Sequence, residues 1–160
     1  LPAKDKMSQP KYQGITKEQI GKFELSENAG TIEVIAGEYK KVKGPASTFT
    51  PVHLYNAKLK NGAKTDFTFP STYNTALLVI EGNVKVNGSE AVPTDHFVLF
   101  ENDGETFTVE ATTDALVLIL SGEPINEPIA AHGPFVMNTR AEIVEAMDDF
   151  NMGKFGYLEE

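Results

Sequence analysis

Short stretches in which apolar and polar residues alternate follow one another from about Lys22 to Ser121, and no helical period separates them. Segments rich in Asn, Asp and Gly, such as 60–63 and 101–105, lie between these stretches. Such residues tolerate the positive φ angles of tight hairpin turns. The pattern therefore predicts an all-β region with strands near 31–36, 52–59, 65–70, 75–81, 83–88, 96–100, 105–111 and 115–121.

The apolar residues predict which strands lie at the centre of a sheet. Phe67 and Phe69 fall on one face of their strand, because alternate side chains of a strand point the same way. The stretches 75–81 and 115–121 are apolar on both faces, which is typical of central strands covered on two sides. Eight such strands at short spacing predict a double-sheet jelly roll or a small barrel.

The pattern changes after Ser121. Apolar residues recur at helical spacing through 140–151, with acidic residues on the opposite side, and Thr139 with Glu142 has the form of a capping box. We therefore expect a C-terminal α-helix at about 140–151. Residues 128–137, "PIAAHGPFVM", are expected to form a loop that packs through its apolar side chains.

Composition narrows the class of protein further. A chain of 160 residues with 41% hydrophobic content suits one soluble domain, and no apolar run approaches the length of a membrane span. The formal charge of −9 disfavours binding to nucleic acid, and the one basic cluster, Lys40, Lys41 and Lys43, is expected to be a solvated loop. No cysteine is present, which fits the reducing cytoplasm. Because the chain begins with Leu1 and not with Met, we expect it to be part of a longer protein.

The three histidines, His53, His96 and His132, are far apart and form no local metal motif. A mononuclear metal site on β-strands usually takes two ligands from one strand, in the form H-x-H. The nearest approach is His53 with Tyr55, for which a structural role is the better explanation. No cysteine or Gly-x-Ser-x-Gly elbow marks a nucleophile either.

Four stretches of the sequence resemble the C-terminal half of the pirin family. They are "IAGEYKKVKGPAST", "VHLYNAKLKNGA", "FPSTYNTALLVIEG" and, most specifically, "SGEPINEPIAAHGPFVMNTRAEIVEAMDDFNMGKFGYL". The resemblance implies a cupin-type jelly roll at 15–160 with a C-terminal helix, preceded at 1–14 by the remnant of a linker. Pirins are bicupins, so the resemblance also implies a second, N-terminal cupin lobe as partner.

The same resemblance also indicates whether this chain should bind a metal ion. In the family a metal, usually iron, sits in the N-terminal lobe on an H-x-H pair and a later H-x-E pair, and several members show quercetin 2,3-dioxygenase activity. Alignment by eye places the corresponding positions of this chain at Thr68 and Pro70, and at Leu99 and Glu101. Glu101 alone cannot hold iron in a site that needs several protein ligands. We therefore expect no cofactor in this chain, and iron or another divalent metal in the N-terminal lobe.

These observations lead to three functional hypotheses. The first is a non-catalytic, metal-free cupin lobe of a pirin-like protein whose intact form is a quercetin 2,3-dioxygenase-type oxidoreductase. The alternatives are a jelly-roll module that binds a protein partner or a small aromatic ligand, and a metal dioxygenase in its own right. A homodimer of the isolated lobe is also expected. Two sets of residues matter for these hypotheses: the inward aromatics Phe67, Phe69, Tyr73 and Phe97, and the candidates for a lobe interface or cavity, His132, Phe135, Met137, His53 and Tyr55.

Overall fold

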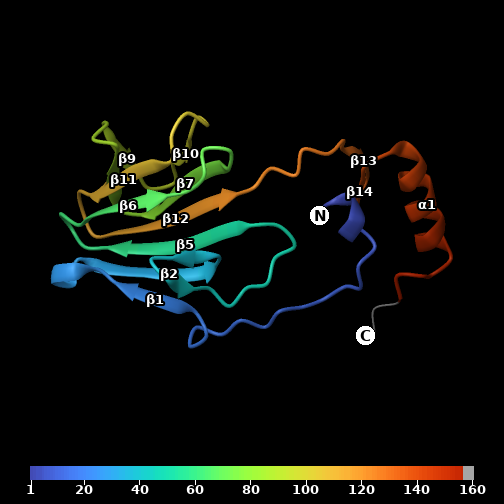
Figure 1. Cartoon of the computed structure of the whole chain (residues 1–160), viewed down its shortest axis with the longest axis horizontal. Helices are drawn as coiled ribbons and strands as arrows, with labels where there is room; N and C mark the ends of the chain where they lie inside the picture. The colour runs from blue at the N-terminus through green and yellow to red at the C-terminus, as the bar shows by residue number, and fades with distance from the viewer. Residues whose placement is uncertain (157–160) are drawn as a thin grey trace. The chain divides into compact units, whose positions relative to one another are not determined.

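The computed structural model describes residues 1–156 and divides into two units (Figure 1). The larger unit comprises Lys11–Pro124. The smaller unit combines Leu1–Pro10 with the part of the chain from Ile125 onward. Each unit is compact by itself.

Two antiparallel sheets make up the larger unit. One has six strands in the order β1 (Gly21–Glu24), β2 (Gly30–Ala36), β5 (Val52–Leu59), β12 (Ala115–Gly122), β7 (Asn74–Glu81) and β10 (Phe97–Leu99). The other has four in the order β6 (Lys64–Thr68), β11 (Thr106–Ala111), β8 (Asn83–Val86) and β9 (Ala91–Pro93). Neighbours in each sheet are distant in sequence, as in a jelly roll. The predicted all-β, cupin-type jelly roll is confirmed.

The core lies between the two sheets and follows the predicted alternation. On β6, Thr65 and Phe67 are buried while Lys64, Asp66 and Thr68 are exposed. On β12, the side chains that face the core are Val117 and Ile119, both fully buried. The eight predicted strands are all present, because each carries enough apolar residues on its inner face to hold it against the opposite sheet.

The basic cluster is exposed to solvent, as expected, but it belongs to a hairpin and not to an irregular loop. Strands β3 (Glu38–Tyr39) and β4 (Val42–Lys43) pair around Lys40 and Lys41, whose φ angles are 45° and 73°. Positive φ at both central residues is the geometry of a type I′ turn. The hairpin buries the Tyr39 ring in the core, and the Lys40 ammonium lies 5.2 Å from its centroid. Two lysines gave no turn signal, because Asn and Gly are the usual residues at these positions.

Strands β1 and β9 were also not predicted. Strand β1 lies at an edge of its sheet and has one large apolar residue, Phe23, which packs against the core. Strand β9 ends at Pro93, which an edge strand tolerates because its outer N–H groups need no partner. Neither strand carries a long apolar pattern.

The smaller unit contains the 3-10 turn η1 (Ala3–Asp5), strands β13 (Ala130–His132) and β14 (Phe135–Met137), and helix α1 (Arg140–Asn151). Helix α1 confirms the predicted C-terminal helix, including the capping box between Thr139 and Glu142. The carboxylate of Asp149, near its C-terminal end, pairs with Lys154. Within residues 1–156, no helix has the length and apolar character required to cross a membrane.

The predicted loop at 128–137 is instead a β-hairpin. His132 pairs with Phe135 across a two-residue turn made by Gly133 and Pro134. Gly133 has a φ of 54°, and a type II′ turn requires positive φ at its first central residue only, so proline fits the second. Proline usually ends a strand, and here it completes the turn.

The most deeply buried ring provides a test of the core. Replacing the fully buried Phe67 with alanine leaves a cavity, and such changes cost about 3–5 kcal/mol of unfolding free energy. We expect a loss in this range in urea denaturation. Phe97→Ala is the matched control: its ring is 59% exposed, so the loss should stay below about 1 kcal/mol. Equal losses in the two variants would contradict the assignment of the core.

Candidate functional site

Aromatic rings fill the interior of the jelly roll, where a cupin would hold its metal and substrate. Tyr39, Tyr55, Phe67 and Phe107 form a continuous series in which ring centroids lie 5.7 Å, 6.3 Å and 5.5 Å apart. Phe69 extends the series, with centroid distances of 5.9 Å to Tyr55 and 6.3 Å to Phe107. All five side chains are at most 6% exposed. The space between the sheets is therefore occupied by side chains.

The structure shows which residues around the predicted H-x-H positions point inward. Thr68 and Pro70, the positions taken from the alignment, are exposed, and Thr68 contacts Thr106 on the outer face of the four-stranded sheet. The residues that point inward are Phe67 and Phe69. Thr68 and Pro70 therefore do not reach the interior, since alternate residues of a strand face opposite sides.

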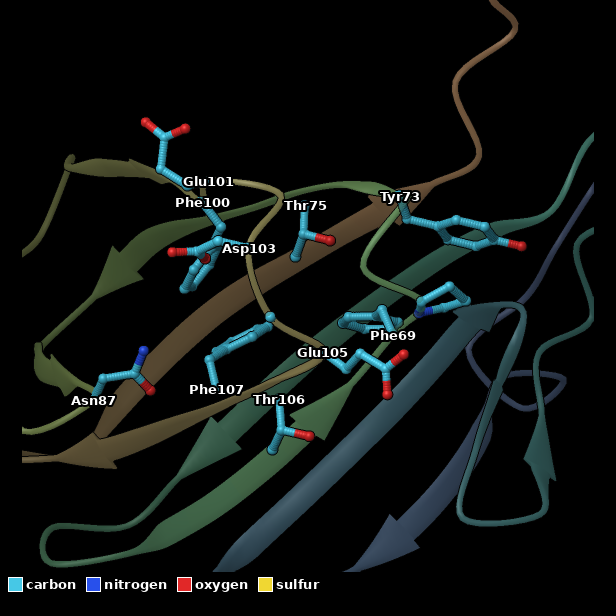
Figure 2. A pocket seen from close by; sticks show the side chains of 12 residues that line it. Phe69, Tyr73, Thr75, Asn87, Phe100, Glu101, Asp103, Glu105, Thr106 and Phe107 are labelled. Atoms are coloured by element: carbon cyan, nitrogen blue, oxygen red, sulfur yellow. The ribbon is translucent and has the colours of Figure 1, made fainter.

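The two residues predicted at the H-x-E positions also point away from the interior. Leu99 pairs with Ala76 on the outer face of the six-stranded sheet and is 72% exposed. Phe100 is half-buried against the core, and its ring centroid lies 4.2 Å from that of Phe107. The Glu101 side chain is exposed and points away from these rings (Figure 2). The predicted inward position of Phe97 is wrong for the same reason, because Val98 faces the core in its place.

His53 and Tyr55 share the inner face of β5 and form a hydrogen-bonded pair. The Tyr55 hydroxyl donates to the Glu38 carbonyl oxygen at 2.6 Å, so it can only accept from His53 Nδ1, 2.8 Å away. The Nδ1 atom therefore carries the hydrogen, and Nε2 of the neutral ring keeps a free lone pair. Gly37 makes the close approach of the histidine feasible, because a Cβ there would lie 2.5 Å from Nδ1.

Burial controls the protonation of this pair. It lowers the pKa of His53, because a charged imidazolium is poorly solvated there. Burial also raises the pKa of the Tyr55 hydroxyl far above its ordinary value, with smaller contributions from Tyr39 and Glu38. Both groups are consequently neutral at physiological pH, as expected of residues with a packing role.

The interior opens to solvent through a small cavity of about 70 Å³, part of whose wall is formed by Phe69, Tyr73 and Phe100 (Figure 2). Carboxylates of Glu101, Asp103 and Glu105 stand around it. Deeper in the wall, the hydroxyl groups of Thr75 and Ser121 lie 2.8 Å apart and satisfy each other. A cavity of this size has room for one or two water molecules and not for a flavonol.

The residues of this interior do not fit a divalent metal. Phe67, Phe69 and Phe100 have no donor atoms, so the Nε2 atom of His53, whose Nδ1 atom bonds Tyr55, is a single donor beside three apolar rings. Throughout residues 1–156, no three His, Asp or Glu side chains are grouped in a way that could hold a metal ion. An iron site of the cupin type needs several such ligands and open positions beside them.

The outer face of the six-stranded sheet carries an apolar surface. Two cross-strand rows run over β10, β7 and β12: Phe97, Leu78 and Leu118 in one, and Leu99, Ala76 and Leu120 in the next, where Leu54 of β5 continues it. These seven residues are called the outer apolar patch. The opposite sheet presents Lys64, Asp66 and Thr68 on its outer face. Since only one outer face is apolar, that face is suited to contact with another protein surface.

The remaining candidates from the sequence lie in the smaller unit. His132 is exposed at the end of β13, while Phe135 and Met137 are half-buried on β14. The Phe135 ring packs edge-on against Phe150 of α1, with centroids 6.1 Å apart. In the smaller unit this segment therefore packs against helix α1. Sequence reasoning missed Phe100 and the Thr75–Ser121 pair, because only the strand register shows that they face inward.

The His53–Tyr55 pair predicts a pH dependence of stability. The unfolded chain binds a proton at the ordinary histidine pKa of about 6.5, and the folded state does so only at lower pH. Unfolding free energy should therefore fall as pH decreases below about 6.5, and His53→Gln should weaken this dependence in urea titrations between pH 5 and 7.5. The exposed His96→Gln serves as the control. An unchanged slope in His53→Gln would refute the assignment.

Comparison with known proteins agrees with this fold. The family model of the pirin C-terminal cupin domain matches residues 54–156. Pirin-1 of Arabidopsis thaliana is 37% identical over 163 residues, covering 98% of this chain and 56% of that protein. A Pseudomonas aeruginosa protein with a provisional quercetin 2,3-dioxygenase name is 39% identical over 155 residues, covering 97% of this chain and 54% of that protein.

Among solved structures, a quercetin 2,3-dioxygenase from Acinetobacter baumannii superposes with a TM-score of 0.91 at 42% identity, covering 99% of this chain and 55% of that one. The chain thus spans about half the length of the relatives that it matches. On the family model and these identities, the chain belongs to the pirin family.

Proposed function

We propose that this chain acts as a non-catalytic, metal-free cupin lobe that supports a second, amino-terminal lobe in a pirin-type protein. The observation that carries the proposal is that the inward-facing residues beside the predicted metal-pair positions are Phe67, Phe69 and Phe100. Apolar rings cannot hold iron, and they occupy the volume in which oxygen and substrate would bind. The lobe then contributes a stable core to the intact protein, and the catalytic reaction takes place in the other lobe.

The outer apolar patch supports a packing role. Phe97 and Leu99 are 59% and 72% exposed, and leaving such side chains in water is unfavourable. We assign this patch to contact with the amino-terminal lobe of the intact protein. In the isolated chain the same patch would favour a homodimer, which sedimentation at increasing protein concentration would reveal as a rising apparent mass.

The activity of the whole protein is a separate part of the proposal. Two of the relatives are named for quercetin 2,3-dioxygenase activity, and both are about twice as long as this chain. We therefore place a quercetinase-type oxidoreductase activity, with iron or another divalent metal, in the amino-terminal lobe. The lack of cysteine agrees with a cytoplasmic location.

A binding module for a small aromatic ligand is the second candidate, because Tyr73 and Phe69 line an opening in the jelly roll. The cavity behind them, about 70 Å³, is too small for a flavonol unless the rings move. Packing of the core accounts for these rings without a ligand.

Oxygen uptake with quercetin tests the proposal. The purified chain, reconstituted with iron(II), should consume no oxygen above the background of iron(II) and quercetin in buffer. A titration of quercetin fluorescence should likewise show no saturable binding. Oxygen consumption that scales with protein and saturates with quercetin would overturn the proposal, while saturable binding without consumption would favour the aromatic-ligand module.

A further inference from the structure

A long groove separates strand β13 from helix α1 in the smaller unit. It has a volume of about 680 Å³, roughly ten times that of the opening in the jelly roll. One wall is formed by four consecutive residues, Ile129 to His132, along β13. The other is formed by Arg140, Ile143, Val144 and Met147, which share one face of the helix. The groove is thus bounded by a strand edge and by a helix face.

The strand wall has an unused backbone edge. Among residues 1–156, β13 pairs only with β14, so its second edge has no strand partner. In an antiparallel ladder, every second residue directs its N–H and C=O groups to each edge. An exposed edge of this kind can accept an added strand, whose main chain supplies the missing hydrogen bonds.

Apolar side chains line the groove and face water. Ile129 is 82% exposed and Val144 is 59% exposed, while Ile143 forms a buried floor. Asn138, which also lines the groove, donates through Nδ2 to Glu127 Oε2 and to the Pro128 carbonyl oxygen. These two acceptors fix the amide orientation, and the buried Oδ1 atom has no partner among the described residues. The groove therefore offers apolar contacts, while Asn138 Oδ1 is buried beneath its surface.

The position of the chain's first residues indicates what fills the groove. Pro2 is buried in the smaller unit, and the backbone N–H of Ala3 donates to Glu127 Oε2 at 2.7 Å. The matched family model is a C-terminal domain, and the relatives are about twice as long as this chain. In those relatives the amino-terminal half would therefore join the chain at the unit that contains the groove.

We propose that the groove between β13 and α1 binds an extended segment of the amino-terminal half, which adds as a strand to the free edge of β13. Its alternate side chains cover Ile129 and Val144. An acidic residue of the segment suits the end of the groove at Arg140, which forms no ion pair within residues 1–156. This inference rests on the proposed packing role of the lobe and assigns to it a second contact surface, separate from the outer apolar patch.

Amide hydrogen exchange tests the assignment. The amino-terminal half of the Pseudomonas aeruginosa relative is joined ahead of Leu1, and exchange is compared with that of the 160-residue chain alone. We expect at least tenfold slower exchange over residues 129–132 in the fusion. Val144→Lys in the groove should abolish this protection. The matched control is Val136→Lys on β14, an equally exposed valine outside the groove, which should leave the protection intact.

Each other outcome has a distinct meaning. Slower exchange over β10 of the outer apolar patch, without any change at β13, would reject the groove as the binding site. The proposed function would then still hold. No protection at either surface would reject both. Protection at β13 in the chain alone that grows with concentration would identify a second copy as the occupant. If the fusion fails to fold, the full-length Pseudomonas aeruginosa relative is compared with its own fragment that aligns with this chain, and unprotected amides there reject the proposal.

Discussion

The packing of aromatic rings between the two sheets is the interaction on which the rest of the structure depends. Phe67 and Tyr55, almost fully buried, lie against each other at the centre, and Phe69, Phe107 and Tyr39 surround them. Large rings contribute much of the apolar surface that a small β-protein can bury. The same rings fill the space between the sheets, so the packing that stabilises the lobe also leaves little room there for a ligand.

Polar groups at the margin of this core are arranged so that each has a partner. The Tyr39 hydroxyl lies 2.9 Å from Thr65 Oγ1, and the Tyr55 hydroxyl links His53 to the backbone of the β3–β4 hairpin. Thr75 and Ser121 pair in the same way. Satisfied groups of this kind avoid the cost of burying a polar atom without a hydrogen bond. They also leave few atoms of the interior available to a ligand.

Much of the fold could be predicted from the sequence, because long strands have a pattern of their own. The alternation around Phe67 and the capping box at Thr139 are local signals, and both were confirmed. The hairpins at Lys40 and at Gly133 were missed, since their strands are only two or three residues long, and the Lys-Lys pair of the first gives no turn signal. Short strands depend on tertiary contacts that a local pattern does not contain.

The candidate site was harder to predict than the fold. Its family could be named from long stretches of sequence, and Phe67 and Phe69 were correctly placed inward, but the residues aligned with the metal pairs face outward. A stretch such as 96–100 is apolar on nearly every residue, so its alternation does not reveal which side faces the core. Pairing of Leu99 with Ala76 on the outer face resolves the register. The groove beside β13 had no sequence signal, because it arises from the meeting of a hairpin and a helix.

The central claim is that the aromatic interior excludes a metal, and metal content tests it most directly. The purified, tag-free chain is reconstituted with iron(II), passed through a desalting column and analysed for iron, zinc, manganese, nickel and copper. The account predicts far less than one equivalent of any of these metals per chain. A tightly held stoichiometric metal, lost when His53 is replaced, would contradict it and would assign the oxidoreductase chemistry to this lobe.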